Sequence, residues 1–267
     1  MESAAKKRTS IAIVTGASSG MGREFVRQIA DGYRSISQIW VIARREQALL
    51  ELKDELLKSG ITDTQIRTLP LDLGEETAFQ ELDLLLKNEK PLIRILVNSA
   101  GLGHSGRLEN QSVEEALSMI DINCRALTAI TMVCLPYFRK GSRIIQMDSG
   151  SAFLPQPGFA VYAASKSYVL SLSRALREEL RTRGISVTAV CPGPVDTPFF
   201  ETGGITLNSV KKLFLKKPEK VVRKALFDAE KGKAVSVCGC SMKLVRAASG
   251  ILPQGLMTSL SSLLFSL

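Results

Sequence analysis

The 267-residue chain is predicted to fold as an α/β protein with a doubly wound, seven-stranded parallel sheet and helices on both faces. Short apolar runs rich in Val and Ile alternate with segments of helical periodicity along most of the sequence, which is typical of βαβ units. With 45% hydrophobic and 23% charged residues, the chain can bury a sizeable core, and general disorder is excluded. No linker divides it, so one domain is expected.

The apolar β-rich runs predict strands, in chain order, at residues 11–15, 38–43, 65–71, 92–98, 142–147, 185–191 and 234–237. Apolar residues at helical spacing between these runs predict helices at residues 21–31, 45–59, 75–88, 113–138, 159–183 and 218–231.

Residues 194–217 interrupt this alternation with Pro194, Pro198, Gly203 and Gly204, and they are predicted to form a long loop or lid. The chain is therefore divided into a basic tail (1–9), one α/β domain (10–240) and an apolar and basic helical extension (241–267).

The net charge of +9 is concentrated near the C-terminus, because residues 205–267 carry +8 and residues 9–204 carry −1. No uninterrupted apolar run reaches the roughly 18 residues of a transmembrane helix, and no apolar segment of a secretory signal precedes the first strand. A cytoplasmic location is expected. The five cysteines are scattered through apolar segments, which favours reduced, buried thiols and no metal site.

A glycine-rich turn follows the first predicted strand and opens the first predicted helix. It contains Gly16, Ser18, Ser19, Gly20, Met21 and Gly22. Glycines allow a pyrophosphate to approach the backbone, and the helix N-terminus supplies N–H donors and positive charge. The spacing differs from the common dinucleotide fingerprint, so an ordinary turn is the alternative.

Tyr162 and Lys166 lie four residues apart in a predicted helix, so their side chains share one face. A nearby ammonium lowers the pKa of a phenol from its usual value of about 10 and makes it a usable acid or base. Taken alone the pair is a weak signal, because such pairs occur by chance.

In combination these motifs resemble the short-chain dehydrogenase/reductase family. Further matches are Asn98-Ser99-Ala100-Gly101 after the fourth strand, Asn123, Ser149 thirteen residues before Tyr162, and Pro192-Gly193-Pro194-Val195-Asp196-Thr197 after the sixth strand. The resemblance covers roughly residues 9–200 and implies a Rossmann-like oxidoreductase.

The resemblance implies a catalytic set of four residues. Tyr162 is the general acid or base, and Ser149 polarises the substrate carbonyl. Lys166 lowers the tyrosine pKa and holds the nicotinamide ribose, while Asn123 anchors a water of the proton relay. Ser151 is a rival for the role of Ser149, but its spacing to Tyr162 fits the family less well.

NADP(H) is the expected cofactor. Arg44 and Arg45 follow the second strand, where NAD-preferring relatives place an aspartate, and an arginine there accommodates a 2′-phosphate. The alternative is that both arginines are simply solvated. The other cofactor contacts implied by the resemblance are Gly16, Ser18, Ser19, Gly20, Met21, Gly22, Asp72, Asn98, Ala100, Gly101, Tyr162, Lys166, Pro192, Gly193, Val195 and Thr197.

Asp148 departs from the family pattern, since a serine is more usual immediately before Ser149. We expect its carboxylate to be solvated or paired with a basic residue on the other side of the sheet. A substrate contact is the alternative.

The predicted lid indicates a lipophilic ketone or secondary alcohol as substrate, because it carries Phe199, Phe200, Leu207, Leu213, Phe214 and Leu215. Nearby lysines would favour an anionic substrate tail, or they form a plain solvated face: Lys211, Lys212, Lys216 and Lys217. A hydroxysteroid or bile acid is expected first and a 3-oxoacyl thioester second. A non-catalytic, cofactor-binding interaction protein is the alternative of another class.

The C-terminal extension has one apolar helix face, formed by Leu256, Leu260, Leu263, Leu264 and Leu267. This face could pack on its own domain, form a subunit interface, or lie on an anionic membrane with Lys243 and Arg246 outward. By resemblance, a homodimer or homotetramer forms through the helices at 113–138 and 159–183. No motif indicates nucleic-acid binding.

Overall fold

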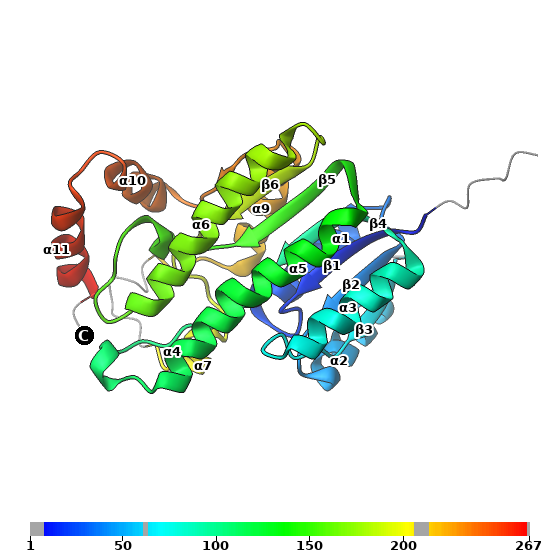
Figure 1. The fold of residues 1–267 in the computed structure, drawn as a ribbon, viewed down its shortest axis with the longest axis horizontal. Coiled ribbons are helices and arrows are strands. Elements are labelled where there is room, and N and C mark those ends of the chain that lie inside the picture. The colour runs from blue at the N-terminus through cyan, green and yellow to red at the C-terminus, as the bar shows by residue number, and fades with distance from the viewer. Residues whose placement is uncertain (1–7, 61–63, 206–213, 266–267) are drawn as a thin grey trace, which may run out of the picture.

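The computed structural model describes residues 8–60, 64–205 and 214–265. Its core is a seven-stranded parallel sheet with the order β3-β2-β1-β4-β5-β6-β7, as predicted (Figure 1). The strands are β1 Ser10–Thr15, β2 Gln38–Ile42, β3 Gln65–Leu69, β4 Leu92–Asn98, β5 Phe138–Met147, β6 Ser186–Val190 and β7 Val235–Ser236.

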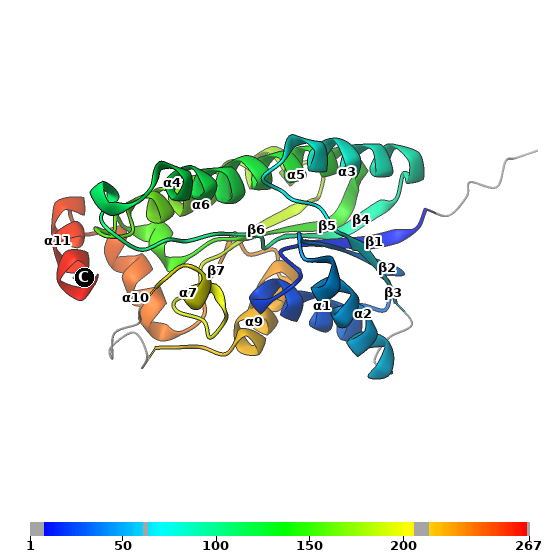
Figure 2. The same ribbon diagram turned by 90° about the horizontal axis from the view of Figure 1, so that it is seen from below.

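Helices cover both faces of the sheet (Figure 2). On one face lie α1 Gly20–Gly32, α2 Glu46–Lys58 and α9 Pro218–Glu230, and on the other lie α3 Glu76–Glu89, α4 Val113–Ile120, α5 Leu127–Cys134 and α6 Ala160–Arg181. Strand residues alternate between the two cores: Ala12 and Val14 pack with α1, whereas Ile11 and Ile13 pack with α3 and α5. This alternation is the two-residue period of a strand buried on both faces.

The predicted helix at 113–138 is wrong in two respects. Between α4 and α5, residues Asp121–Ala126 form a π-helical turn, and the helical stretch ends in a short 3-10 turn at Leu135–Tyr137. Phe138 already belongs to β5, where it pairs with Ile93 and is fully buried. This pairing joins residues far apart in the sequence, so local periodicity does not reveal where the strand begins.

The helical stretch Val113–Tyr137 has the length and apolarity of a membrane span. Its inner face packs against the sheet, with Ile130 and Cys134 fully buried in the core beside α3 and α6. We therefore interpret it as a core helix.

The predicted lid leaves β6 at the cleft, forms the short helix α7 Phe199–Thr202, and returns through a bridge between Val195 and Lys216. The predicted lid residues Leu207, Lys211, Lys212 and Leu213 lie outside the described part of the chain.

The C-terminal extension folds as α10 Cys240–Ser249 and α11 Gln254–Phe265, at the end of the molecule toward which the strands point (Figure 1). At the start of α11, Met257 is buried and Leu256 is half exposed. Leu267 and the side chains of Leu260, Leu263 and Leu264 lie outside what the structure describes, so the predicted apolar face is seen only in part.

Candidate active site

One large cleft of about 1360 Å³ opens at the carboxyl ends of the strands. Its walls are the turn after β1, the loops after β2 to β6, the start of α6, and α10. Ligands of doubly wound sheets bind at this edge. All four residues predicted to be catalytic come from elements that meet there, although Asn123 lies behind the wall.

The backbone of the glycine-rich turn has a shape that lets a ligand approach it closely. Gly16 and Gly20 have φ angles of +66° and +53°, which favour glycine. A Cβ on Gly16 would lie 2.8 Å from the backbone N of Ala100, and one on Gly22 would collide with the Gly16 carbonyl. The first turn of α1 begins at Gly20 and borders the cleft, so its N–H groups and positive dipole end fit a diphosphate.

The two predicted arginines border the cleft beside this turn. Arg45 donates a 3.2 Å hydrogen bond to the Ser18 hydroxyl. The Arg44 side chain is 66% exposed and lies 4.0 Å from the Asp72 carboxylate, a spacing too loose and too solvated to fix it. The guanidinium of Arg44 is therefore available to a phosphate.

The loop after β6 closes the opposite wall of the cleft with Pro192, Gly193, Val195 and Thr197. The Thr197 side chain faces the glycine-rich turn, because its Cβ lies 3.3 Å from the position of a Cβ on Gly20. These residues, together with Met21, Ala100 and Gly101, line the cleft as a bound dinucleotide would require.

Asn98 is the one predicted cofactor residue that does not line this cleft. Its side chain is buried below the loop and donates hydrogen bonds to Thr131 and Gln146, both at 2.9 Å. Asn98 therefore ties β4 to β5 and α5.

Ser149 begins the loop that follows β5. This loop is fastened to β6, because the Asp148 N–H donates to the Val190 carbonyl and the Gly150 N–H donates to the Pro192 carbonyl. The Ser149 hydroxyl accepts a hydrogen bond from the Ser151 N–H at 3.1 Å and donates to the Ser151 hydroxyl at 3.2 Å. The rival serine thus orients Ser149.

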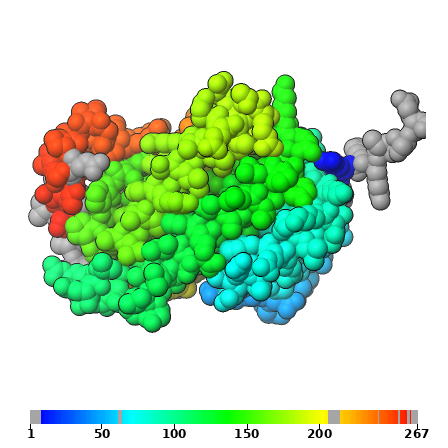
Figure 3. Space-filling model, in the orientation of Figure 1, coloured from blue at the N-terminus to red at the C-terminus, as the bar shows by residue number. Residues whose placement is uncertain are grey.

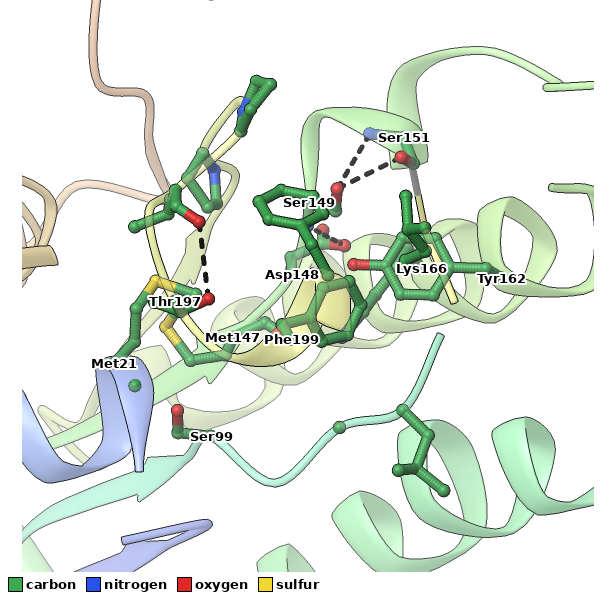
Figure 4. Close-up of a pocket in the computed structure, with 18 of the residues that line it drawn as sticks. Met21, Ser99, Met147, Asp148, Ser149, Ser151, Tyr162, Lys166, Thr197 and Phe199 are labelled. Atoms are coloured by element: carbon green, nitrogen blue, oxygen red, sulfur yellow. Dashed lines mark hydrogen bonds between the residues drawn. The ribbon is translucent and has the colours of Figure 1, made fainter. Parts of the chain in front are cut away.

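Tyr162 lies in the first turn of α6, with its hydroxyl directed toward Asp148 and Ser149 (Figure 4). Burial raises the pKa of Tyr162, a hydrogen bond to the Ser149 side chain opposes this effect, and the charge of Asp148 adds to it. The pKa of Tyr162 is therefore raised, whereas the expected effect of Lys166 alone is to lower it. The phenol is therefore protonated at neutral pH.

Lys166 is fully buried one helical turn beyond Tyr162, and its ammonium lies 5.6 Å from the tyrosine ring centroid. It donates a 2.9 Å hydrogen bond to the Met147 carbonyl at the end of β5. Burial lowers the pKa of Lys166, and the charge of Asp148 raises it.

Asn123 occupies the π-helical turn and has no exposed surface. Its amide accepts from the Leu102 N–H at 2.9 Å and donates to the Leu102 carbonyl and the Ser165 hydroxyl. Asn123 therefore fixes the loop after β4 against α6 next to Lys166. The water relay stays a prediction.

The expectation that Asp148 is solvated or paired with a basic residue is wrong. The residue is 3% exposed, and its carboxylate accepts hydrogen bonds from the Ser149 N–H at 2.8 Å and the Cys191 thiol at 3.4 Å. No salt bridge within the described residues includes it. Burial raises the pKa of Asp148 to about 7, while the charge of Lys166 lowers it. The reason is tertiary: β5 carries the residue inward between β6 and α6.

Aromatic side chains from the lid and α6 cover Tyr162. Phe159 stacks on its ring with centroids 4.3 Å apart, and Phe199 of α7 lies 5.6 Å away. A Cβ on Gly103 would strike Phe199 and Tyr162, so this glycine lets the loop after β4 pass beneath them.

Met242 of α10 is a site residue that sequence reasoning missed. Its side chain packs directly on the backbones of Gly150 and Gly193, and thereby joins the extension to both loops that carry site residues. Met242 precedes the predicted apolar face, which begins at Leu256, and a single apolar residue does not specify a partner.

A family model described as short chain dehydrogenase matches residues 10–205 of the chain. An uncharacterized oxidoreductase of Staphylococcus epidermidis is 32% identical over 211 residues, which are 78% of this chain and 87% of that protein. A very-long-chain 3-oxoacyl-CoA reductase of Pyricularia oryzae is 33% identical over 69% of this chain and 56% of its own length.

Among solved structures, a short-chain dehydrogenase from Sphingobium yanoikuyae in complex with NADPH superposes with a TM-score of 0.78. The two chains share 26% sequence identity, and the match covers 93% of this chain and 95% of the other.

Proposed function

Because the chain belongs to the short-chain dehydrogenase/reductase family, we propose that it is an NADP(H)-dependent oxidoreductase that interconverts a lipophilic ketone and its secondary alcohol. The observation that carries the proposal is the meeting of Tyr162, Ser149 and Lys166 in one cleft beside the glycine-rich turn.

In the proposed reduction, the Ser149 hydroxyl turns its hydrogen from Ser151 to the ketone oxygen and polarises the carbonyl. Tyr162, which burial keeps protonated, gives its phenolic proton to the oxygen as negative charge develops there. Bound NADPH supplies the hydride for the carbon. Lys166 lies beside the phenol and stabilises the tyrosinate that the proton transfer leaves.

The exposed guanidinium of Arg44, next to Ser18 and Arg45, supports NADP(H) as the preferred cofactor. An arginine recognises a phosphate through charge-assisted, bidentate hydrogen bonds. The complex of the Sphingobium relative with NADPH is consistent with this choice.

The substrate end of the cleft supports a lipophilic molecule, since it is walled by Leu154, Phe159, Phe199, Phe200, Val245, Leu252 and Met257. A hydroxysteroid or bile acid is the first proposed substrate class. A 3-oxoacyl thioester is the second, and similarity to the Pyricularia reductase favours it. Lys216, at the rim, suits an anionic tail of either class.

We also propose that the protein is a cytoplasmic homodimer or homotetramer. Exposed apolar side chains on α4, α5 and α6 support pairing, namely Leu117, Ile120, Met132 and Tyr168. Light scattering on the purified chain tests this: a monomer at all concentrations would contradict it.

The test of function is oxidation of NADPH and NADH against keto-steroids, keto bile acids and 3-oxoacyl thioesters, followed through the absorbance of the reduced nicotinamide. We expect turnover with NADPH and one lipophilic class. Better turnover with NADH would contradict the cofactor assignment. Binding of both cofactors without turnover of any ketone would favour the non-catalytic interaction protein.

A further inference from the structure

Exposed apolar side chains gather where the cleft meets α10 and α11. This mouth patch consists of Phe214, Leu244, Ile251, Leu252 and Leu256, which are 46%, 71%, 83%, 38% and 49% exposed. Phe214, Leu244 and Leu252 also line the cleft, so the patch is continuous with the substrate pocket. The patch is therefore the apolar rim of the pocket opening.

Exposed cations are close in sequence to mouth-patch residues, because Lys217 follows Phe214 by three positions and Lys243 and Arg246 lie on either side of Leu244 in α10. Lys217, Lys243 and Arg246 are exposed, and no salt bridge among the described residues includes any of them. Residues 231–267 contain no acidic side chain, which leaves this end of the chain uniformly cationic. An apolar surface with neighbouring exposed cations fits an anionic lipid surface.

The position of the patch suits such a surface. The helices α10 and α11 form one end of the molecule, and β1 lies toward the other end (Figures 1 and 3). Met242 anchors α10 to the loops of the site, while Leu244 on the same helix points outward at 71% exposure. A second copy on this face would bring Lys243 and Arg246 of both copies together, and this repulsion disfavours self-association.

We propose that the mouth patch docks on the surface of an anionic phospholipid bilayer, so that the pocket opens toward the lipid and takes its substrate from there. The inference rests on the proposed function in one respect, since uptake from a bilayer requires a lipophilic substrate. Docking itself is independent of turnover. Apolar side chains enter the boundary of head groups and acyl chains, while the cations attract the lipid charge.

The test is flotation of the full-length protein with vesicles of phosphatidylglycerol and phosphatidylcholine, compared with vesicles of phosphatidylcholine alone. We expect binding to the anionic vesicles and weakening by salt. In one variant, Lys243→Glu and Arg246→Glu are combined; in the other, Ile251→Ser and Leu256→Ser are combined. Each cation near an anionic surface increases the partition of a protein onto the vesicles by a factor of roughly five. The variant with Lys243→Glu and Arg246→Glu should therefore bind the anionic vesicles at least about tenfold more weakly.

The matched control combines Leu57→Ser with Lys58→Glu on α2, a 58% exposed leucine beside an exposed lysine outside the mouth patch. It should bind vesicles like the unchanged protein. All these residues lie outside the cleft, so turnover of a water-soluble ketone with NADPH should persist in each variant. That assay reports on the proposed function separately, because its failure leaves the vesicle result unchanged.

Several results would overturn docking. These are absence of flotation with the unchanged protein, equal binding to neutral vesicles, and equal loss in the α2 control. A change of oligomeric state in the Ile251→Ser and Leu256→Ser variant, without vesicle binding by the unchanged protein, would instead identify the face as a contact between copies.

Discussion

Among single residues, Asp148 has the broadest influence on the candidate site. Its charge raises the pKa of both Tyr162 and Lys166, and its carboxylate receives the N–H of Ser149. A carboxyl that titrates near neutral pH beside the proton donor couples the state of the site to pH. Asp148 is thus a positioning residue for Ser149 and an electrostatic neighbour of Tyr162.

Replacement of Asp148 by Asn should stabilise the protein increasingly as pH rises. Between the ordinary carboxyl pKa of 3.8 and its raised pKa of about 7, the folded chain keeps the proton that the unfolded chain releases. The free energy of unfolding of the unchanged protein therefore falls across this window. Asn is neutral throughout, so the free energy of unfolding of the variant should rise relative to that of the unchanged protein, by on the order of a few kcal/mol across this window.

Urea unfolding at about pH 5 and about pH 8 measures this difference. The variant Asp54→Asn, on an exposed carboxylate of α2, is the matched control. A constant gap between the Asp148→Asn variant and the unchanged protein at both pH values would show that the carboxyl does not titrate there.

Arg44 should determine the choice of cofactor. We expect Arg44→Ala to lower kcat/KM for NADPH by about 10- to 100-fold, the equivalent of a hydrogen bond to a charged group, and to leave kcat/KM for NADH almost unchanged. Steady-state kinetics with both cofactors measures the ratio of kcat/KM for NADPH to kcat/KM for NADH. The control is Arg34→Ala, which replaces an exposed arginine outside the cleft. Equal losses with both cofactors would refute a 2′-phosphate contact.

At the scale of elements, the lid and the loop after β4 are in backbone contact. A Cβ on Gly203, the residue that follows α7, would collide with the Gly103 carbonyl, and Phe199 at the start of α7 lies against Tyr162. The two glycines therefore set the height of the lid above the site. A backbone carbonyl cannot move aside for an added Cβ, whereas the end of a flexible side chain can.

Gly203→Ala should displace α7 and lower kcat/KM by about tenfold or more, because a misplaced substrate wall costs orientation. Thermal unfolding should show only a small change, since α7 lies at the edge of the cleft. Gly32→Ala is the control, because a Cβ there meets nothing within 4 Å. Unchanged kinetics in Gly203→Ala would mean that the lid adjusts without consequence.

For the whole molecule, local patterns were enough to predict the sheet, the glycine-rich turn and the shared helix of Tyr162 and Lys166, whereas the roles of these two residues came from the family resemblance. Features that depend on distant pairing were not predictable in this way. Phe138 joins β5 because it pairs with Ile93, and Asp148 is buried because β6 and α6 surround it. Asn98 faces the core through its bonds to Thr131 and Gln146.

The C-terminal helices make the same point. The sequence predicted an apolar extension with three possible fates, and no local pattern chooses among them. The contact of Met242 with the backbones of Gly150 and Gly193 becomes evident only when α10 has folded against the loops after β5 and β6. The wall of the cleft is therefore shared between the segment that matches the family model and helices beyond it.

In the proposed NADPH-dependent ketone reduction, Tyr162 transfers the proton. The most direct test is the Tyr162→Phe variant, assayed for turnover of the best ketone and, by fluorescence titration, for NADPH binding. We expect turnover to fall by at least about 100-fold, within the range of lost general acid catalysis, while NADPH affinity changes little. Turnover equal to that of the unchanged protein would contradict the account.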